Sequence, residues 1–197
     1  MGRHIVLKTA FRVQDIMIFT LIGFMGCGKS SIGKHIAGKL GCDFADSDIL
    51  VEKGEGMTVT EIFSRYGETG FREIEYRYID RTVRSYGGRA DWKRDGDGKA
   101  KSLIFALGGG AVTYKATATL IKERTFPIYI KCSPEELIAN LKEDGTAGRP
   151  MLAGYDLETR VRQLLSEREA AYGNCARLIV SPSGLEEAIV KGLSPIR

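Results

Sequence analysis

The amino-acid sequence predicts an α/β protein with three layers, in which a parallel sheet lies between two layers of helices. Short apolar segments alternate with amphipathic ones along the chain, as in folds where each strand is followed by a helix. The length of 197 residues suits one domain, and a hydrophobic fraction of 43% suits a chain that buries a full core. A glycine-rich segment directly after the first apolar segment indicates a phosphate-binding loop on this sheet.

Five segments have the length and composition of buried strands. They are residues 16–22, 43–45, 103–107, 127–131 and 178–180. The first is an apolar run that ends at Gly23, and the third ends at a run of three glycines. Because amphipathic segments separate them, we expect the five strands to run parallel.

Amphipathic segments between these strands predict the helices that cover the sheet. They are residues 29–40, a helix that starts at 58, residues 71–85, residues 117–123, a helix that starts at 134, residues 156–172, and a last helix that ends near 192. Thr58 and Glu61 fit a capping box. Ser133 before Pro134 fits the start of another helix, since serine caps helices and proline is accepted in the first turn.

The domain is expected at residues 16–197, with residues 1–15 as a disordered or peripheral extension. That extension is charged and lacks the apolar core and cleavage site of a signal peptide, although a transit peptide is an alternative. Residues 87–101 are charged and rich in glycine, which predicts a mobile surface loop. Residues 144–155 form a second loop, between two helices.

Charge and cysteine content exclude several classes of protein. The net charge is +4, from 29 basic and 25 acidic residues, without the run of lysines and arginines that marks a nucleic-acid-binding surface. No apolar run approaches the length of a membrane span. Four scattered cysteines and two histidines do not form a zinc set. We therefore expect a cytoplasmic protein, a monomer, with neither nucleic acid nor membrane as a partner.

Residues 23–30 read Gly-Phe-Met-Gly-Cys-Gly-Lys-Ser and match G-x-x-x-x-G-K-[ST], after an apolar strand and at a helix start. Backbone N–H groups of such a P-loop point at phosphate oxygens, aided by the helix N-terminus. Lys29 is expected to reach the β- and γ-phosphates, and the Ser30 hydroxyl to ligate Mg²⁺. The expected ATP-binding residues are Gly26, Cys27, Gly28, Lys29, Ser30 and Ser31.

Two other classes with glycine-rich loops are excluded. A GTPase also needs the base-reading motif N-K-x-D, which the sequence lacks, and the D-x-x-G match at residues 95–98 lies in the irregular loop. A calcium loop around the same residues would place Ile104 where a carboxylate is required.

Asp46 and Asp48 follow the second strand, at the carboxyl edge of the sheet, where open α/β sheets bind ligands. Alternate residues of an extended segment face opposite ways, so the two carboxylates can serve different partners. One can hold Mg²⁺ through water, while the other accepts a proton from a hydroxyl. A solvated acidic turn is an equally good interpretation of this pair alone.

Arg72 and Glu75 lie three residues apart on one face of a predicted helix, which also fits an ordinary surface pair. Three glycines, Gly108, Gly109 and Gly110, leave the third strand and allow a ligand to reach bare backbone, although a loose turn would also fit.

Arg149 lies in the loop at residues 144–155, from which a mobile side chain can close over phosphates and neutralise charge in the transition state. Arg168 and Tyr172 share a face of the next helix. Either arginine taken alone also fits a plain surface residue.

Taken together and in this order, these segments resemble the shikimate kinases, over about residues 16–192. The resemblance implies a fold like that of nucleoside monophosphate kinases, with five parallel strands between helices and a mobile lid, here at residues 144–155. It implies transfer of the γ-phosphate of ATP to the 3-hydroxyl of shikimate, with Mg²⁺ as cofactor, in the pathway to aromatic amino acids.

The resemblance also implies a role for each matching residue. Asp46 helps to hold Mg²⁺, largely through water, and Asp48 binds the acceptor hydroxyl and acts as its base. Arg72 and Arg168 grip the shikimate carboxylate, and Glu75 orients the network around that carboxylate.

The remaining roles fall to glycines and to the lid. Gly108 belongs to the same substrate-binding segment as Gly109 and Gly110, which contact a shikimate hydroxyl through their backbone. Arg149 is the lid arginine on the transferred phosphate. Lys142 stands about where the family tends to carry an arginine that stacks on adenine, and lysine stacks less well.

Two alternatives stand beside this interpretation. A kinase for another polyol such as gluconate would share the P-loop without requiring the combination of Arg72, the three glycines and Arg168. A non-catalytic regulator with the same fold would usually have lost one of Lys29, Ser30, Asp48 and Arg149, and all four are present.

Overall fold

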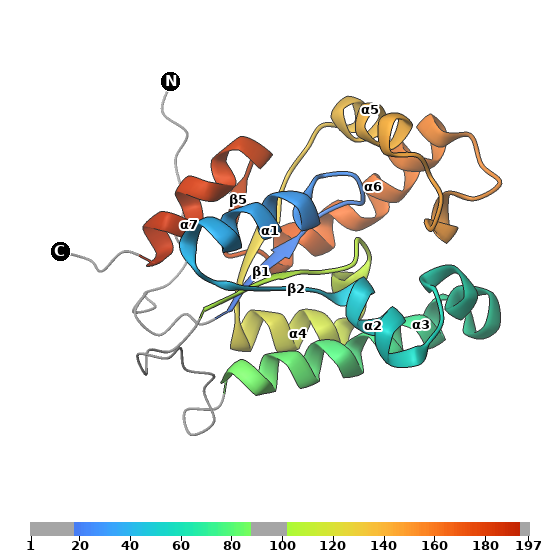
Figure 1. Ribbon diagram of the computed structural model, residues 1–197. Helices are drawn as coiled ribbons and strands as arrows, with labels where there is room; N and C mark the ends of the chain where they lie inside the picture. Colours follow the sequence, from blue (N-terminus) through green and yellow to red (C-terminus); the bar gives the residue numbers. More distant parts are fainter. Residues whose placement is uncertain (1–17, 88–101, 194–197) are drawn as a thin grey trace.

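The computed structural model describes residues 18–87 and 102–193, and its centre is a parallel sheet (Figure 1). The strands are β1 (Ile18–Ile22), β2 (Asp43–Asp46), β3 (Leu103–Ala106), β4 (Phe126–Ile130) and β5 (Leu178–Val180). Their order in the sheet is β2-β3-β1-β4-β5, and all four pairings are parallel. The five predicted strands are confirmed, with ends that agree within two residues.

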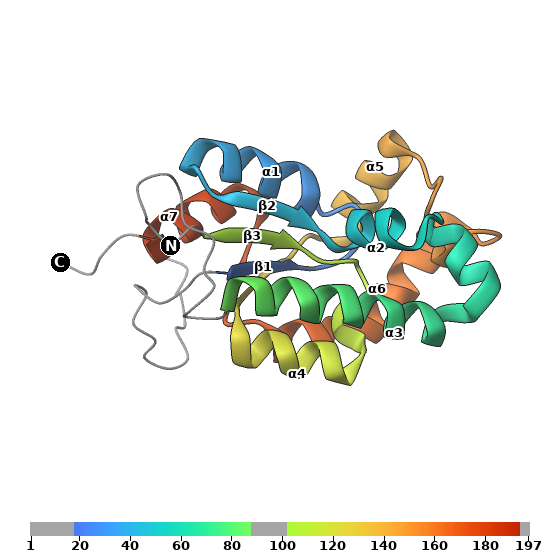
Figure 2. The ribbon, with the colours of Figure 1, turned by 60° about the horizontal axis from the view of Figure 1, so that its bottom comes forward.

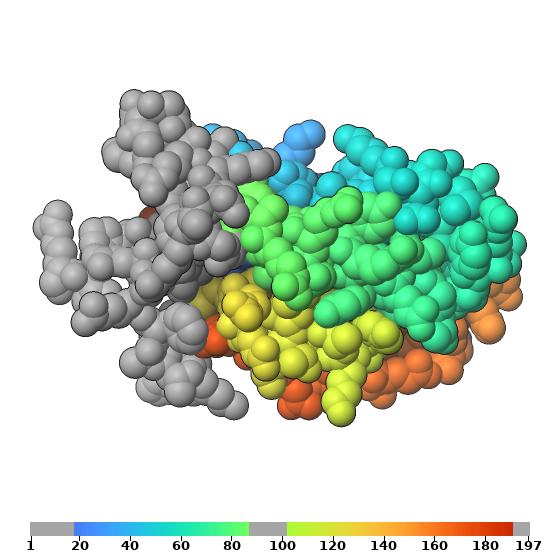
Figure 3. Space-filling view, turned by 90° about the horizontal axis from the view of Figure 1, so that it is seen from below, coloured from blue at the N-terminus to red at the C-terminus, as the bar shows by residue number. Residues whose placement is uncertain are grey.

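Helices cover both faces of the sheet, so the predicted three layers are confirmed. They are α1 (Lys29–Leu40), α2 (Ser47–Glu55), α3 (Val59–Gly87), α4 (Lys115–Arg124), α5 (Pro134–Asp144), α6 (Leu157–Cys175) and α7 (Leu185–Leu193). Helices α1 and α7 lie on one face and α3 and α4 on the other (Figure 2). In Figure 3, α3 and α4 lie side by side and form much of the surface on their side of the molecule. None of the helices described is both long enough and apolar enough to cross a bilayer.

The segments predicted to be loops are only partly described. Residues 1–15 and 88–101 lie outside the described residues. Gly87 belongs to the end of α3, so the helix extends one residue into the predicted loop. Within the loop predicted at 144–155, Asp144 ends α5 and the segment Pro150–Leu152 forms a short 3₁₀ turn.

Helix α2 was not predicted. The Asp46 carboxylate caps it, accepting hydrogen bonds from the N–H groups of Asp48, at 3.0 Å, and Ile49, at 3.4 Å. Gly56 ends the helix in the left-handed conformation, with φ 65°. Asp48 therefore lies in the first turn of a helix, and the prediction of an extended segment around it was wrong.

The long helix α3 consists of two helical parts, as predicted, separated at Gly67, which has φ 68° and ψ −178°. The capping box at its start is confirmed, since Thr58 N–H donates to Glu61 at 2.7 Å and Glu61 N–H donates to the Thr58 hydroxyl at 3.2 Å. The Ser133 cap of α5 is confirmed as well.

Two apolar clusters hold these elements in place. The larger surrounds the sheet, where all five residues of β1 are buried. The smaller joins α2 to both parts of α3 through Val51, Ile62, Phe71 and Ile74. This second cluster fixes α2 and α3 where they extend past the carboxyl ends of the strands (Figure 1).

Candidate active site

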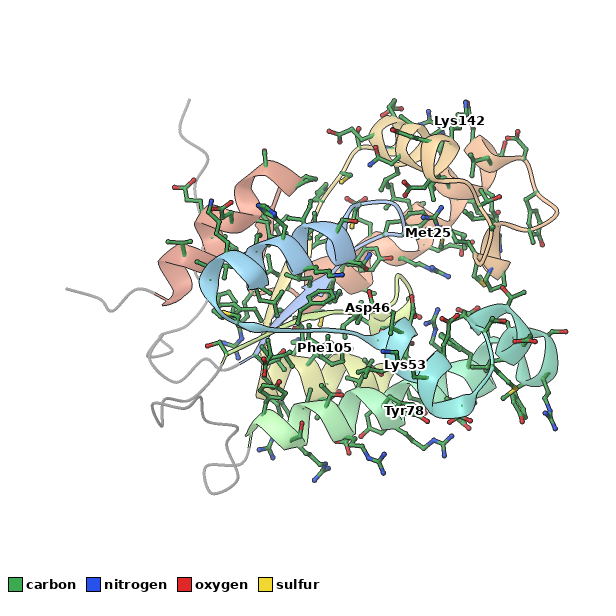
Figure 4. All side chains as sticks on the ribbon, in the orientation of Figure 1. Met25, Asp46, Lys53, Tyr78, Phe105 and Lys142 are labelled. Atoms are coloured by element: carbon green, nitrogen blue, oxygen red, sulfur yellow. The ribbon has the colours of Figure 1, made fainter. Side chains whose placement is uncertain are left out.

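The predicted site residues lie around the carboxyl ends of the strands. Strand β1 lies in the middle of the sheet, between β3 and β4. Strands β2 and β3 follow β1 in the chain and lie on one side of it, whereas β4 and β5 lie on its other side. Ligands of open α/β sheets bind at such a change of direction. Figure 4 shows Met25 of the phosphate loop and Asp46 at the end of β2 on this same edge.

The phosphate loop has the backbone that its glycines permit. Gly28 is the N-cap of α1 and has φ 83°, in the left-handed region that other residues seldom adopt. The Lys29 ammonium is buried and donates to the carbonyl oxygens of Gly23 and Phe24, each at 2.9 Å. The side chain of Lys29 therefore lies across its own loop, at the N-terminus of α1.

A residue of α5 also holds this loop. The Asn140 side-chain amide donates to the Gly26 carbonyl at 2.8 Å. Sequence reasoning missed Asn140, because its position on a helix more than a hundred residues away gives no local signal. The contact links the phosphate loop to the helix that leads into the predicted lid.

Two thiols lie against Lys29. The Cys27 sulfur is 3.6 Å from the Lys29 ammonium and accepts a hydrogen bond from Cys132, which follows β4. Both interactions lower the pKa of Cys27, the bond from Cys132 most, although burial opposes them. The same bond raises the pKa of Cys132. The charge of Cys27 also contributes to raising the pKa of Tyr129 and of Tyr172, which burial raises most. The loop thus holds a thiol that favours its ionised form.

Ser30 and Asp46 meet where Mg²⁺ was predicted. The Ser30 hydroxyl donates to Asp46 Oδ2 at 2.5 Å. Hydroxyl and carboxylate oxygens are ligands that Mg²⁺ accepts, and Mg²⁺ commonly takes one or two protein ligands beside water and phosphate. Within residues 18–87 and 102–193, no three His, Cys, Asp or Glu side chains cluster as a metal site. The oxygen pair therefore fits Mg²⁺ shared with a nucleotide.

The Asp48 side chain is half-buried in the first turn of α2, while Asp46 caps the same helix. Burial, and after it the carboxylates of Glu75 and Asp46, raise the pKa of Asp48 to about 7 against the opposing charges of Lys29 and Arg72. A carboxyl group with a pKa near neutral is well suited to accept a proton. The two carboxylates have different surroundings because Asp46 caps α2 and Asp48 lies in its first turn, and not because they alternate along a strand.

Ser47, between these aspartates, was missed as a site residue. It is fully buried, its hydroxyl oxygen accepts from Gly108 N–H at 2.8 Å, and its side chain hydrogen-bonds to Glu75. Ser47 therefore joins α2, the end of β3 and α3. The only signal in the sequence is a small polar residue between two aspartates that already account for the motif.

Arg72 and Arg168, which are 96 residues apart in the chain, come together as predicted. Both are buried, and Glu68 lies within 4 Å of each. Arg72 also pairs with the fully buried Glu75 at 2.7 Å. Arg72 Nε and Arg168 Nη1 have no partner among the described residues. An unpartnered buried N–H is costly, so these donors are suited to bind a ligand.

The three glycines after β3 leave room for charged side chains. A methyl group at Gly108 would overlap Glu75 and approach Asp48, and one at Gly110 would overlap the Arg72 guanidinium. The Tyr172 hydroxyl donates to the carbonyl of Gly109. The absence of side chains here thus lets Asp48, Glu75 and Arg72 approach the same backbone.

The two basic residues predicted near the nucleotide have partners elsewhere. The Arg149 guanidinium donates to the Gly145 carbonyl and lies 3.3 Å from Asp144, within the predicted lid. Lys142, which Figure 4 labels on α5, pairs with Glu158 of α6 at 2.8 Å. Arg149 and Lys142 therefore depend on movement of the lid or of their own side chains to reach a nucleotide.

Comparison with known proteins gives consistent matches. The family model described as "Shikimate kinase" matches residues 25–89 and 97–194. The shikimate kinase of Zymomonas mobilis is 38% identical over 153 residues, which are 78% of this chain and 77% of that protein. The shikimate kinase of Caldanaerobacter subterraneus is 37% identical, over 77% of this chain and 79% of that protein.

Solved structures agree with these sequence matches. Shikimate kinase from Acinetobacter baumannii in complex with shikimate has a TM-score of 0.76 at 28% identity, covering 90% of this chain and 93% of that one. Shikimate kinase from Aquifex aeolicus has a TM-score of 0.69 at 25% identity, covering 90% and 96%. With the P-loop, the acidic pair and the two buried arginines at one edge of the sheet, the chain belongs to the shikimate kinase family.

Proposed function

We propose that the chain transfers the γ-phosphate of ATP to the 3-hydroxyl of shikimate, using the residues gathered at the carboxyl edge of the sheet. As a member of the shikimate kinase family it is an ATP-dependent kinase with an alcohol as acceptor. The proposal concerns which side chains do the work. The observation that carries it is the convergence of Asp48, Arg72 and Arg168 around the glycines after β3.

On the acceptor side, Arg72 and Arg168 hold the carboxylate of shikimate. Two buried guanidinium groups, each with an unpartnered N–H, suit a rigid carboxylate that must be held in one orientation. Glu75 keeps Arg72 in place through the 2.7 Å ion pair. Gly109 and Gly110 offer backbone to a ring hydroxyl, with Gly108 in the same segment.

Asp48 accepts the proton of the acceptor hydroxyl. As the oxygen forms its bond to the γ-phosphorus, the bond between that phosphorus and the bridging oxygen of ADP breaks, and the proton moves to the Asp48 carboxylate. The raised pKa of Asp48, about 7, supports this role. Nearby Lys29 both stabilises the transferring charge and favours the ionised form of Asp48.

On the nucleotide side, the loop at Gly26–Ser31 holds the phosphates, and Ser30 with Asp46 holds Mg²⁺. Bound Mg²⁺ neutralises charge on the β- and γ-phosphates. Arg149 moves from its partners Asp144 and Gly145 onto the transferred phosphate when the lid at 144–155 closes. Lys142 contributes to the adenine side only after it leaves Glu158, so we expect it to contribute little to nucleotide affinity.

We further propose that residues 16–197 form one domain. The chain is proposed to act as a cytoplasmic monomer. The buried cysteines Cys27, Cys132 and Cys175 are present as thiols, which supports a reducing compartment.

An acceptor comparison tests the proposed function. Purified protein is assayed for ADP release with ATP, Mg²⁺ and either shikimate or gluconate, and the product is identified by phosphorus NMR. We expect turnover with shikimate, phosphorus on the 3-hydroxyl, and loss of activity when EDTA removes Mg²⁺. Equal turnover with gluconate would favour the other polyol kinase and contradict the proposal.

A further inference from the structure

The Glu68 carboxylate lies between the two arginines that we assign to the substrate. Glu68 Oε1 is 3.2 Å from Arg72 Nη2 and 3.6 Å from Arg168 Nη2. The arginine side chains are 7% and 6% exposed, whereas that of Glu68 is 42% exposed. A single carboxylate oxygen at the rim of the pocket thus bridges two buried guanidinium groups.

The charges around this bridge explain why a carboxylate is there. Arg72 and Arg168 bring two positive charges into a buried region, and the fully buried Glu75 brings one negative charge. One positive charge is left over, and an uncompensated buried charge is costly. Glu68 supplies the missing negative charge, while Arg72 Nε and Arg168 Nη1 still have no partner within the described residues.

We infer that Glu68 is an internal stand-in for the substrate carboxylate, which must displace it in order to bind. The inference rests on the proposed function, in which Arg72 and Arg168 grip that carboxylate. The Nη2 atoms of both arginines converge on Glu68 Oε1, so a substrate carboxylate that takes these donors together with the unpartnered Arg72 Nε and Arg168 Nη1 has to replace Glu68. Two carboxylates this close would repel each other.

The position of Glu68 in the chain allows the exchange. It follows Gly67, which interrupts α3 with φ 68° and has open space where a side chain would point. Glu68 therefore lies at the start of the second helical part of α3, where a negative charge is favoured even after it leaves the arginines. Its exposed side chain can turn into water without opening the core.

This exchange makes Glu68 a determinant of acceptor specificity. An acceptor with one negative charge replaces Glu68 and leaves the total charge around the two guanidinium groups unchanged. A neutral acceptor that displaced Glu68 would leave a buried guanidinium uncompensated. Discrimination against uncharged polyols thus comes from the cost of removing Glu68 as well as from direct contacts.

Replacement of Glu68 tests the inference through binding alone. Shikimate is titrated into the full-length protein by calorimetry, without nucleotide, for the wild type, Glu68→Gln and Glu68→Met. Because the competing charge is removed, we expect the Kd for shikimate to fall by roughly three- to tenfold in both variants, in line with loss of one partly exposed ion pair. Glu73→Gln, an exposed carboxylate on the same helix, should leave the Kd unchanged.

Thermal unfolding gives a second measurement. Without shikimate, Glu68→Gln should have a lower Tm than the wild type, since the buried arginines lose a partner. With saturating shikimate the increase in Tm should be larger than in the wild type, because binding to the folded state is tighter.

Arg168→Lys separates this inference from the proposed function. If Arg168→Lys weakens shikimate binding while both Glu68 variants strengthen it, the inference is supported. If Arg168→Lys weakens binding but the Glu68 variants bind shikimate no more tightly than the wild type, Glu68 is not a competitor and the inference is overturned, while the proposed function stands. If Arg168→Lys leaves binding intact, both are overturned.

Discussion

A single carboxylate, that of Asp48, has the position and the pKa for proton transfer. It lies beside Glu75 and Asp46 near Gly108, and burial together with these like charges brings its pKa to about 7. Other charged side chains at the site have partners that hold them still, such as Arg72 with Glu75. At the scale of residues, the proposed site therefore sets a carboxyl group with a pKa of about 7 among cations that carboxylates hold in place.

Replacing Asp48 with Asn keeps the size of the side chain and removes its charge and basicity. We expect kcat to fall by roughly 10²–10⁴-fold, the usual contribution of a general base. The Kd for shikimate, measured by calorimetry, should change little because the carboxylate is held by the two arginines. A kcat near that of the wild type would show that another group accepts the proton.

The thiol of Cys27 should ionise more readily than an ordinary cysteine. Its hydrogen bond from Cys132 and the nearby Lys29 ammonium both favour the thiolate. Because the thiol is buried and poorly accessible to reagents, its ionisation is followed by the ultraviolet absorbance of the thiolate, taken as the difference between the wild type and Cys27→Ser, and the midpoint should lie below the ordinary value of about 8.5. Lys29→Met should move the midpoint upward. A midpoint at or above about 8.5 in the wild type would contradict the assigned contacts.

At the scale of elements, the site depends on how α2 meets β3 and α3. Ser47 of α2 connects these elements, because its hydroxyl accepts a hydrogen bond from Gly108 N–H after β3 and its side chain hydrogen-bonds to Glu75 of α3. The smaller apolar cluster, which includes Val51 and Phe71, packs α2 against α3. The positions of the proposed acceptor-binding residues thus depend on contacts among α2, β3 and α3, and not on one loop.

Ser47→Ala should weaken the connection between α2, the end of β3 and α3, because it removes both hydrogen bonds of the Ser47 hydroxyl. It leaves the half-buried Gly108 N–H without its acceptor, which costs about 0.5–1.5 kcal/mol of unfolding free energy, the usual net contribution of one hydrogen bond. We expect a matching loss in urea denaturation and a rise in the KM for shikimate, with the KM for ATP kept. Ser64→Ala, at an exposed position of α3, is the control and should change neither. A stable variant with normal kinetics would show that Ser47 does not position the pocket.

At the scale of the whole molecule, the strands and the phosphate loop were predictable because their signals are local. An apolar run followed by glycines, Lys29 and Ser30 specifies a strand, a turn and a helix start within a few residues. The three glycines after β3 were also singled out, although their structural reason, room for the side chains of Asp48, Glu75 and Arg72, required the fold.

Features that depend on distant contacts were not predictable. Helix α2 has little apolar periodicity and contains Gly54, which is unfavourable in a helix; its place is set by close packing on Tyr78. The contact of Asn140 with the phosphate loop and the bridge from Glu68 to Arg168 join residues that no spacing rule connects. Each requires the folded chain to bring the partners together.

The proposed function requires that two buried arginines select an acceptor with a carboxylate and aim its hydroxyl at ATP. The most direct measurement is steady-state kinetics of the wild type and Arg72→Lys, with shikimate and with its neutral carboxamide as acceptors. Lysine keeps a charge near Glu75 but loses the two-pronged contact.

We expect Arg72→Lys to raise the KM for shikimate by roughly ten- to a hundredfold, as loss of a charge-assisted hydrogen bond predicts. It should also lower kcat, because the hydroxyl is no longer aimed, and leave the KM for ATP nearly unchanged. The carboxamide should be a poor acceptor for the wild type and lose little more in the variant. Equal weakening of ATP and shikimate, or a wild type that phosphorylates the carboxamide as well as shikimate, would contradict the claim.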